Sequence, residues 1–296
     1  MRQLIVNADD FGLTAGVNRA IVETHGGGIV SSATLMANGG AFADAVERAR
    51  AAPTLSVGCH VVLVDGAPVS EPDAVDTLLA IRSAEPDKFH SRLPAVAARA
   101  VLGGFDPDQL VEEITAQIRA IQAAGLEVTH LDTHKHTHVF PEILGALVRA
   151  ARICGVPAMR NPFVPVAAVN AAQFAGKPRL WKRYGQVRML RSFVGQFRTK
   201  VRRAGLATPD GIVGVVETGS FNPSLLRQAL TNLPEGTWEL VCHPGYDDAD
   251  LRATRTRLTE SRDQERRLLM SAELQTLLEE QRIRLISYRE FSGSRS

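Results

Sequence analysis

The amino-acid sequence predicts an α/β protein, namely an irregular (β/α) barrel formed by a single domain. Short runs rich in apolar and β-branched residues alternate with helical patterns along the 296 residues, which favours a mainly parallel sheet. Eight such runs occur, the number of strands in a complete (β/α) barrel, and their uneven spacing predicts irregularity. An open doubly wound sheet is the alternative, because pattern alone separates the two poorly. The strands are expected at 3–8, 29–36, 54–63, 126–132, 156–160, 211–216, 237–242 and 283–288.

The helical segments between these strands have recognisable first turns. Thr14, or one of the glycines beside it, starts the first helix. An Asp-Pro pair at 106–107 supplies an N-cap and a proline at the first helical position of another. Pro141 and Pro223 open two further helices, and an apolar stripe of leucines predicts one long helix over about 250–281.

The composition is that of a globular chain, with 45% hydrophobic and 22% charged residues. No apolar run approaches the roughly 18 residues of a membrane span, and the N-terminus lacks the apolar region and cleavage site of a secretory signal. The three cysteines are few, odd in number and far apart, so a disulfide framework is not expected. We therefore expect a cytoplasmic protein, with peripheral contact at the inner membrane surface left open.

One domain is expected over residues 1–291, followed by a polar tail at 292–296. The stretch 64–105 is long for a connection and is expected to pass over the strand ends. A second excursion is expected at 162–209. It falls in a basic region, because residues 143–209 contain thirteen Lys or Arg and no Asp or Glu.

The predicted strands read as apolar inside and end on polar residues. In parallel α/β proteins, function collects at the carboxyl ends of the strands. Seven of the eight predicted strands end on side chains that could bind a ligand or carry chemistry, and this coincidence is the strongest indication of an active site. In chain order these are Asp9 and Asp10, Thr34 and Asn38, His60, Asp132 and His134, Arg160 and Asn161, Glu217, and His243.

Asp9 and Asp10 form a carboxylate pair directly after the first strand. Adjacent side chains on an extended backbone point to opposite faces, so one could bind a metal while the other addresses water or substrate. The alternative is that one Asp caps the following helix, a role for which Gly12 and Thr14 compete. His60 alone would be weak evidence, and its value depends on what it lies beside.

Four of the eight histidines fall within residues 130–138. On a fully extended backbone they would share one face with Asp132, but same-face neighbours about 6.6 Å apart cannot all bind one ion. The helix start at Pro141 places the strand end near His134, which puts that side chain closest to the pocket. Surface histidines are the alternative. Two His and one Asp suit a catalytic Zn²⁺ or another first-row divalent ion.

Such an ion lowers the pKa of a bound water and polarises a carbonyl. A carboxylate beside it can act as base and a histidine across the pocket as acid. Asp9 and His243 are available for these roles. The sequence therefore predicts metal-assisted hydrolysis of an amide or ester.

Four motifs in this order resemble the YdjC-like carbohydrate deacetylases, which include chitooligosaccharide deacetylase and the hopanoid-biosynthesis protein HpnK. They are N-A-D-D-F-G near the N-terminus, G-C-H at 58–60, H-L-D-T-H-K-H-T-H at 130–138 and C-H-P-G at 242–245. The resemblance covers nearly the whole chain. It implies a (β/α)-barrel hydrolase that binds one divalent ion, Zn²⁺ or Mg²⁺, and removes an N-acetyl group from an amino sugar.

Carried over position by position, the resemblance makes Asp10, His60 and His134 the metal ligands. It makes Asp9 the base and His243 the acid. Two positions depart from the usual pattern without removing a ligand: Thr133 replaces a common Ser, and Lys135 stands where chitooligosaccharide enzymes tend to have His, which could alter substrate preference. Roles behind the ligands or against the sugar are expected for Asn38, Asp132, Arg160 and Glu217. An ordinary buried ion pair is the alternative for Arg160 and Glu217.

A basic segment at 177–203 contains ten Lys or Arg. Apolar residues recur within it at helical spacing, so residues 186–203 predict an amphipathic helix with an arginine-rich polar face. It could pack on the barrel, form a homodimer contact or lie on an anionic membrane surface beside a lipid-linked sugar. Nucleic acid is not expected as a partner, because the net charge is only +2.

Two other functions stay open at this point. A different metal-assisted hydrolase, such as a phosphoesterase, would need a second metal or extra cations. A basic membrane- or nucleic-acid-binding protein without enzymatic activity would depend on the arginine-rich segment instead.

Overall fold

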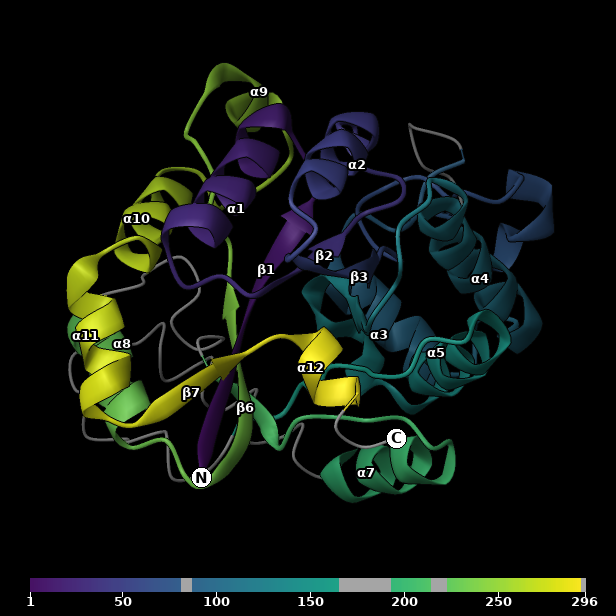
Figure 1. Ribbon diagram of the computed structural model, residues 1–296. Helices are drawn as coiled ribbons and strands as arrows, with labels where there is room; N and C mark the ends of the chain where they lie inside the picture. Colours follow the sequence, from purple (N-terminus) through teal and green to yellow (C-terminus); the bar gives the residue numbers. More distant parts are fainter. Residues whose placement is uncertain (81–86, 165–192, 214–222, 294–296) are drawn as a thin grey trace, which may run out of the picture.

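The computed structural model describes residues 1–80, 87–164, 193–213 and 223–293. Within them one parallel sheet of seven strands forms a half-barrel in the order β4-β3-β2-β1-β6-β5, with β7 also paired to β1 (Figure 1). The predicted α/β barrel class is confirmed. The strands are β1 (Arg2–Phe11), β2 (Ser32–Leu35), β3 (Ser56–Val61), β4 (Leu131–Thr133), β5 (Gly211–Val213), β6 (Gly236–Cys242) and β7 (Ile283–Ile286).

Helices surround the sheet, with α1, α2 and α10 along one side and α4 and α5 along the other (Figure 1). None of the helices in the described ranges is long and apolar enough to cross a membrane. The α-helices are α1 (Ala15–Gly27), α2 (Phe42–Ala51), α3 (Leu93–Val101), α4 (Pro107–Ala123), α5 (Pro141–Cys154), α7 (Val194–Arg203), α8 (Pro223–Thr231), α9 (Ala249–Ala253), α10 (Glu260–Leu269), α11 (Ala272–Glu280) and α12 (Tyr288–Gly293). Within the described residues there are also three short 3₁₀ segments, η1 (Pro72–Ala74), η2 (Asp76–Leu78) and η3 (His134–Val139).

The predicted helix starts are confirmed by their caps. The Thr14 hydroxyl accepts the backbone N–H of Val17 at 3.2 Å. Asp106 accepts N–H groups of the first turn of α4, and prolines begin α5 and α8. Because Thr14 takes the capping role, both carboxylates of the 9–10 pair are left for other partners.

Two predicted elements are wrong in detail. The strand expected at 156–160 exists only as isolated parallel bridges, Leu131 to Met159 and Ala158 to Ala207, because a strand beginning next to Pro157 lacks one ladder donor. The long helix expected over 250–281 is three helices, α9 to α11. Ser271 caps α11 by accepting the N–H of Leu274, which interrupts a continuous helix.

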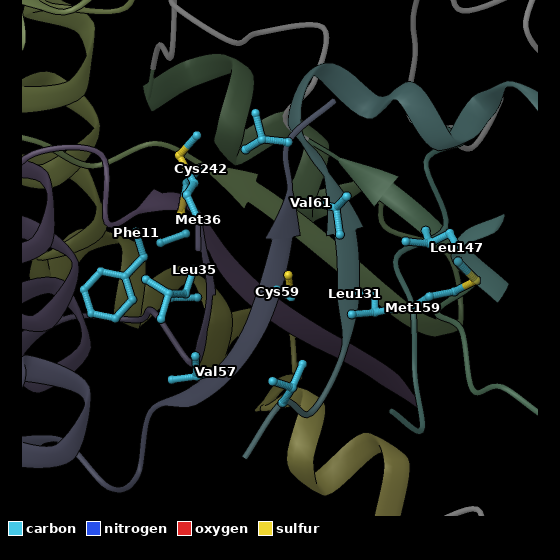
Figure 2. Packing of buried hydrophobic residues seen from close by; sticks show 14 of the residues in the cluster. Phe11, Leu35, Met36, Val57, Cys59, Val61, Leu131, Leu147, Met159 and Cys242 are labelled. Atoms are coloured by element: carbon cyan, nitrogen blue, oxygen red, sulfur yellow. The ribbon is translucent and has the colours of Figure 1, made fainter. Parts of the chain in front are cut away.

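The interior face of the sheet is polar, which corrects the expectation of apolar strand interiors. In β3, Val57, Cys59 and Val61 alternate with residues of the other face, as strand geometry requires. The apolar face packs under the helices: Leu35, Cys59 and Leu131 come from neighbouring strands, with Leu147 of α5 nearby (Figure 2). Buried polar side chains in or next to these strands include Asn7, Asp9, Ser32, Thr34, Ser56, His60, His130, Asp132 and Glu239.

The excursion after β3 is tied to α4 by a buried acid. Glu113 is fully buried, and its two carboxylate oxygens accept the backbone N–H groups of Val69 and Ser70, both at 2.9 Å. Gln117 donates to the same carboxylate at 2.7 Å and also bonds both backbone groups of Val62. This segment, with η1 and η2, is thereby fixed beside the carboxyl end of β3.

Glu113→Gln is expected to lower the free energy of unfolding by about 1–3 kcal/mol, because an amide NH₂ then faces a backbone N–H and leaves a buried donor unpaired. Urea denaturation of both proteins measures this difference. Glu112→Gln makes the same change on the exposed side of α4 and is the control. Equal stability losses in the two variants would contradict the anchoring role of Glu113.

Candidate active site

Three side chains meet at the carboxyl ends of β1, β3 and β4. Asp10 Oδ1 lies 3.4 Å from His60 Nε2 and 3.3 Å from His134 Nδ1, and the two ring nitrogens are 3.2 Å apart. Tetrahedral ligands at bond lengths of about 2.0–2.1 Å are separated by about 3.3 Å. The triangle therefore has the size and the N/O donor chemistry of a site for one small divalent ion.

The groups behind these ligands orient their lone pairs inward. His60 Nδ1 contacts Asp132 Oδ1 at 2.7 Å, so Nδ1 donates to that carboxylate and Nε2 faces the triangle. Arg262 donates to Asp10 Oδ2 at 2.5 Å, which leaves Oδ1 for the ion. Burial lowers the pKa of His60, but Asp132 and Asp10 outweigh it and raise the pKa to about 10. The site thus favours positive charge.

A backbone irregularity brings Asp9 and Asp10 to the same site. Asp10 has φ 64°, and the register of β1 against β2 shifts between Ala8 and Phe11. The backbone is therefore not extended at the second carboxylate, and the expected opposite orientation of the two side chains is wrong. Such a left-handed conformation is uncommon outside glycine and is found where surrounding structure enforces it.

The histidine run is also not extended. The chain leaves β4 at Thr133, and Lys135 and His136 have φ of 55° and 54°. His134 is 22% exposed and faces the opening of the site. His130 is fully buried, with Nε2 2.9 Å from Asn7 Oδ1 and its ring stacked on Tyr288 at 3.7 Å between ring centres. The four histidines therefore do not share one face, and one of them reaches the ligand triangle.

Asp9 belongs to a buried ion network around Arg160. The guanidinium is fully buried and donates to both Asp9 oxygens, at 2.9 and 2.6 Å. It also pairs with Asp132 at 2.5 Å and with Glu239 at 2.7 Å. Burial raises the pKa of Asp9, but the charge and hydrogen bonds of Arg160 prevail and hold it far below its usual range. Asp9 is therefore ionised and can accept a proton, with low basicity.

A second possible ligand group, formed by Asp9, His60 and Asp132, overlaps the first. Both of its carboxylates already accept from Arg160, and the His60 nitrogen facing Asp132 carries a proton. In the triangle that includes Asp10, neither Oδ1 nor the two ring nitrogens are bonded to an arginine, so it is the better ion site.

His243 follows β6 across the site from His60. Its Nε2 lies 3.9 Å from Asp9 Oδ2, and its backbone N–H donates to Glu265 Oε2 at 2.6 Å. Burial lowers the pKa of His243 to about 4, and burial raises the pKa of Glu265 to about 7. A histidine and a carboxylate thus flank the ligand triangle at acid–base distance from a molecule bound there.

Two further residues noted in the sequence lie outside the ligand triangle. Asn38 donates to the carbonyl of Ala67 at 2.6 Å and holds the excursion instead of meeting the triangle. Lys135 pairs with Asp65 at 3.1 Å at the mouth of the site. Glu217 is outside the described residues.

Sequence reasoning missed four buried residues of this site. Glu239 and Tyr288 complete the Arg160 network, with the Tyr288 hydroxyl donating to Glu239 at 2.6 Å. An acid in the middle of an apolar strand was a usable signal for Glu239. Arg262 and Glu265 sit in a strongly charged helix, where nothing in the sequence distinguishes them from exposed residues.

The chain thus combines a parallel half-barrel with an Asp-His-His group at its strand ends that could hold a metal ion. The chain belongs to the YdjC-like family, because the model of the YdjC-like protein family matches residues 3–280. The predicted family is therefore confirmed.

Named relatives agree with this assignment. A carbohydrate deacetylase of Brevibacillus brevis is 32% identical over 97% of this chain and 99% of its own length. A carbohydrate deacetylase of Thermoanaerobacter pseudethanolicus is 28% identical over 97% and 98%. A chitooligosaccharide deacetylase of Salmonella schwarzengrund is 40% identical over 52% and 58%. The crystal structure of a putative cellobiose-phosphate cleavage protein from Enterococcus faecalis shares the fold, with a TM-score of 0.75, 24% identity and 98% coverage of both chains.

Proposed function

We propose that this protein is a metal-dependent hydrolase that removes the N-acetyl group from an amino sugar. One divalent ion, Zn²⁺ or Mg²⁺, would be held by Asp10, His60 and His134. The observation that carries the proposal is the triangle of ligand atoms 3.2–3.4 Å apart, flanked by Asp9 and His243. The names of the relatives supply the substrate class.

When bound, the ion supplies a Lewis acid that polarises the acetyl carbonyl and acidifies water. Asp9, held ionised by Arg160, takes the proton of the attacking water. His243 gives a proton from Nε2 to the sugar nitrogen as the amide C–N bond breaks. Acetate and a free amino sugar leave. Asp132 orients His60, and Arg160 positions Asp9 and Asp132 together.

Among the alternatives, the phosphoesterase reading lacks support in the described part of the site. Arg160 is paired with three carboxylates, and Arg262 is paired with Asp10. These arginines therefore do not present the free cationic surface that a phosphate group needs. The amide substrate, which develops a single negative charge during attack, matches the centre better.

The sugar could be soluble or lipid-linked, and a homodimer is part of the same proposal. The described part of the predicted basic helix is α7. Its side chains Phe197 and Val201 are buried, and the helix packs against α5. The apolar face of this part is thus covered by the protein, which favours packing over membrane contact. Residues 186–192 lie outside the described ranges.

Removal of metal by a chelator is expected to abolish acetate release, and added Zn²⁺ or Mg²⁺ is expected to restore it, because Asp9 and His243 lack an electrophile without the ion. The assay measures acetate from N-acetylglucosamine oligomers and, in parallel, from an N-acetylglucosaminyl lipid. Release from the lipid alone would support membrane contact through the basic segment. Metal-loaded protein that releases no acetate from either substrate would contradict the proposed function.

A further inference from the structure

One helix, α10, brings two buried charged side chains to the site. Arg262 and Glu265 are three residues apart, so they lie on the same helix face, and each is 1% exposed. Arg262 donates to the metal-ligand candidate Asp10. Glu265 contacts the candidate acid His243 instead.

The contact between Glu265 and His243 leaves two polar atoms without partners. Glu265 Oε2 accepts the backbone N–H of His243 at 2.6 Å and lies 3.9 Å from its Nδ1. Within the described ranges, neither His243 Nδ1 nor Glu265 Oε1 has a hydrogen-bond partner, although both are buried. A side-chain rotation that shortens the gap to Oε2 by about 1 Å gives Nδ1 a hydrogen bond. A rotation that brings Oε1 to Nδ1 instead satisfies both of these buried atoms, which are costly to leave unpaired.

The two nitrogens of the His243 ring point to different groups. Nε2 lies on the side of Asp9 and the ligand triangle, whereas Nδ1 lies on the side of Glu265. A carboxylate that accepts Nδ1–H fixes the tautomer of a histidine and stabilises its protonated form.

We infer that Glu265 is a positioning residue for His243: its carboxylate accepts the Nδ1–H of the imidazole and keeps Nε2 as the nitrogen that delivers a proton. The inference rests on the proposed function, in which His243 protonates the leaving sugar nitrogen. The imidazolium then gives its Nε2 proton to that nitrogen and becomes the neutral ring that retains Nδ1–H. Glu265 keeps its charge throughout and does not touch the substrate.

The charges around Glu265 and His243 support the positioning role of Glu265. Among the carboxylates near His243, Asp9 is neutralised by Arg160 and Asp10 by Arg262. Among the described residues, by contrast, Glu265 forms no ion pair with a Lys or Arg and has His243 Nδ1 at 3.9 Å. Burial is the main cause of both the lowered pKa of His243 and the raised pKa of Glu265, and an ion pair between the two groups would oppose both shifts. The groups facing the pair are Asp9 and Asp10 of β1, His60 of β3 and Arg262 of α10.

Glu265→Gln keeps an acceptor for the backbone N–H of His243 but removes the charge. In metal-loaded protein we expect kcat to fall at least about tenfold, with KM within about twofold. The limb of the kcat–pH profile that reports the acid should move to lower pH, because an amide does not stabilise the imidazolium. Glu260→Gln, an exposed acid on the same helix, is the matched control and should change neither value.

A second measurement does not depend on activity. In zinc-loaded protein, the nitrogen NMR shift of His243 Nδ1 should show a protonated atom at slightly alkaline pH, and Glu265→Leu should move the proton to Nε2. An unprotonated Nδ1 in the unmodified protein, or a Glu265→Gln variant with the kcat and pH profile of the control, would overturn the inference. A protonated Nδ1 in a protein that releases no acetate would support the pairing of Glu265 with His243. It would contradict only the proposed function.

Discussion

Replacing His134 with alanine is expected to lower kcat/KM by about 10³-fold or more and to release most of the bound metal. His134 supplies one of the three ligand atoms, 3.2–3.3 Å from the other two. Losing it leaves two ligands, and the several kcal/mol of charge stabilisation that a metal supplies to the reaction fall with metal occupancy. Acetate release and metal content, measured on the same preparations, test both effects.

The matched control is His25→Ala. His25 lies at the end of α1, where it bonds the carbonyl of Val30 and the hydroxyl of Thr54, away from the ligand triangle. The His25→Ala variant should retain metal and activity. If the His134→Ala variant binds metal as well as the unmodified protein does, the triangle is not the metal site, whatever the activity of the variant.

The positions of the three candidate ligands could be predicted because each lies at the carboxyl end of a strand or directly after it. Strand direction and a parallel sheet force consecutive carboxyl ends to one edge, so Asp10, His60 and His134 had to converge once the strands were identified. The same rule placed Arg160 at the site, although its strand is reduced to single bridges. The parallel topology thus brings most of the site residues together, and the sequence motifs indicate where each strand ends.

The local backbone geometry of the site could not be predicted from the hydrophobic and polar pattern of the sequence. The left-handed residues Asp10, Lys135 and His136 are not glycine, and no side-chain periodicity encodes a positive φ at such positions. These residues decide that both carboxylates face one site and that the histidine run turns after His134. Both features contradict an extended reading of the motifs.

Tertiary partners on distant helices were equally invisible. Arg262 reaches Asp10 across 252 residues of sequence, and its helix reads as a solvated segment because most of its residues are charged. Glu239 was different, since a buried acid within a strand requires a buried cation. Pairing it with Arg160 was a deduction that the sequence allowed in principle.

Replacing Arg160 with methionine is expected to lower the free energy of unfolding by about 3–5 kcal/mol, since it leaves buried carboxylates without their cation. Asp9, Asp132 and Glu239 all pair with this guanidinium, and each is at least 96% buried as a side chain. Urea denaturation of metal-free protein at neutral pH measures the loss. Arg149→Met, which breaks an exposed pair with Asp108, should cost about 1 kcal/mol or less.

The loss should depend on pH with a definite sign. In the unmodified protein the folded-state pKa of Asp9 lies below 3.8, so its pairing stabilises the fold above that pH and is lost as pH falls through the lowered value. Without Arg160, burial dominates and raises the pKa of these carboxyl groups in the folded state. The variant then loses stability as pH rises, so the difference between the two proteins should shrink from neutral pH to about pH 5. A difference that stays constant over this range would mean that Arg160 acts through packing of its side chain and not through its charge.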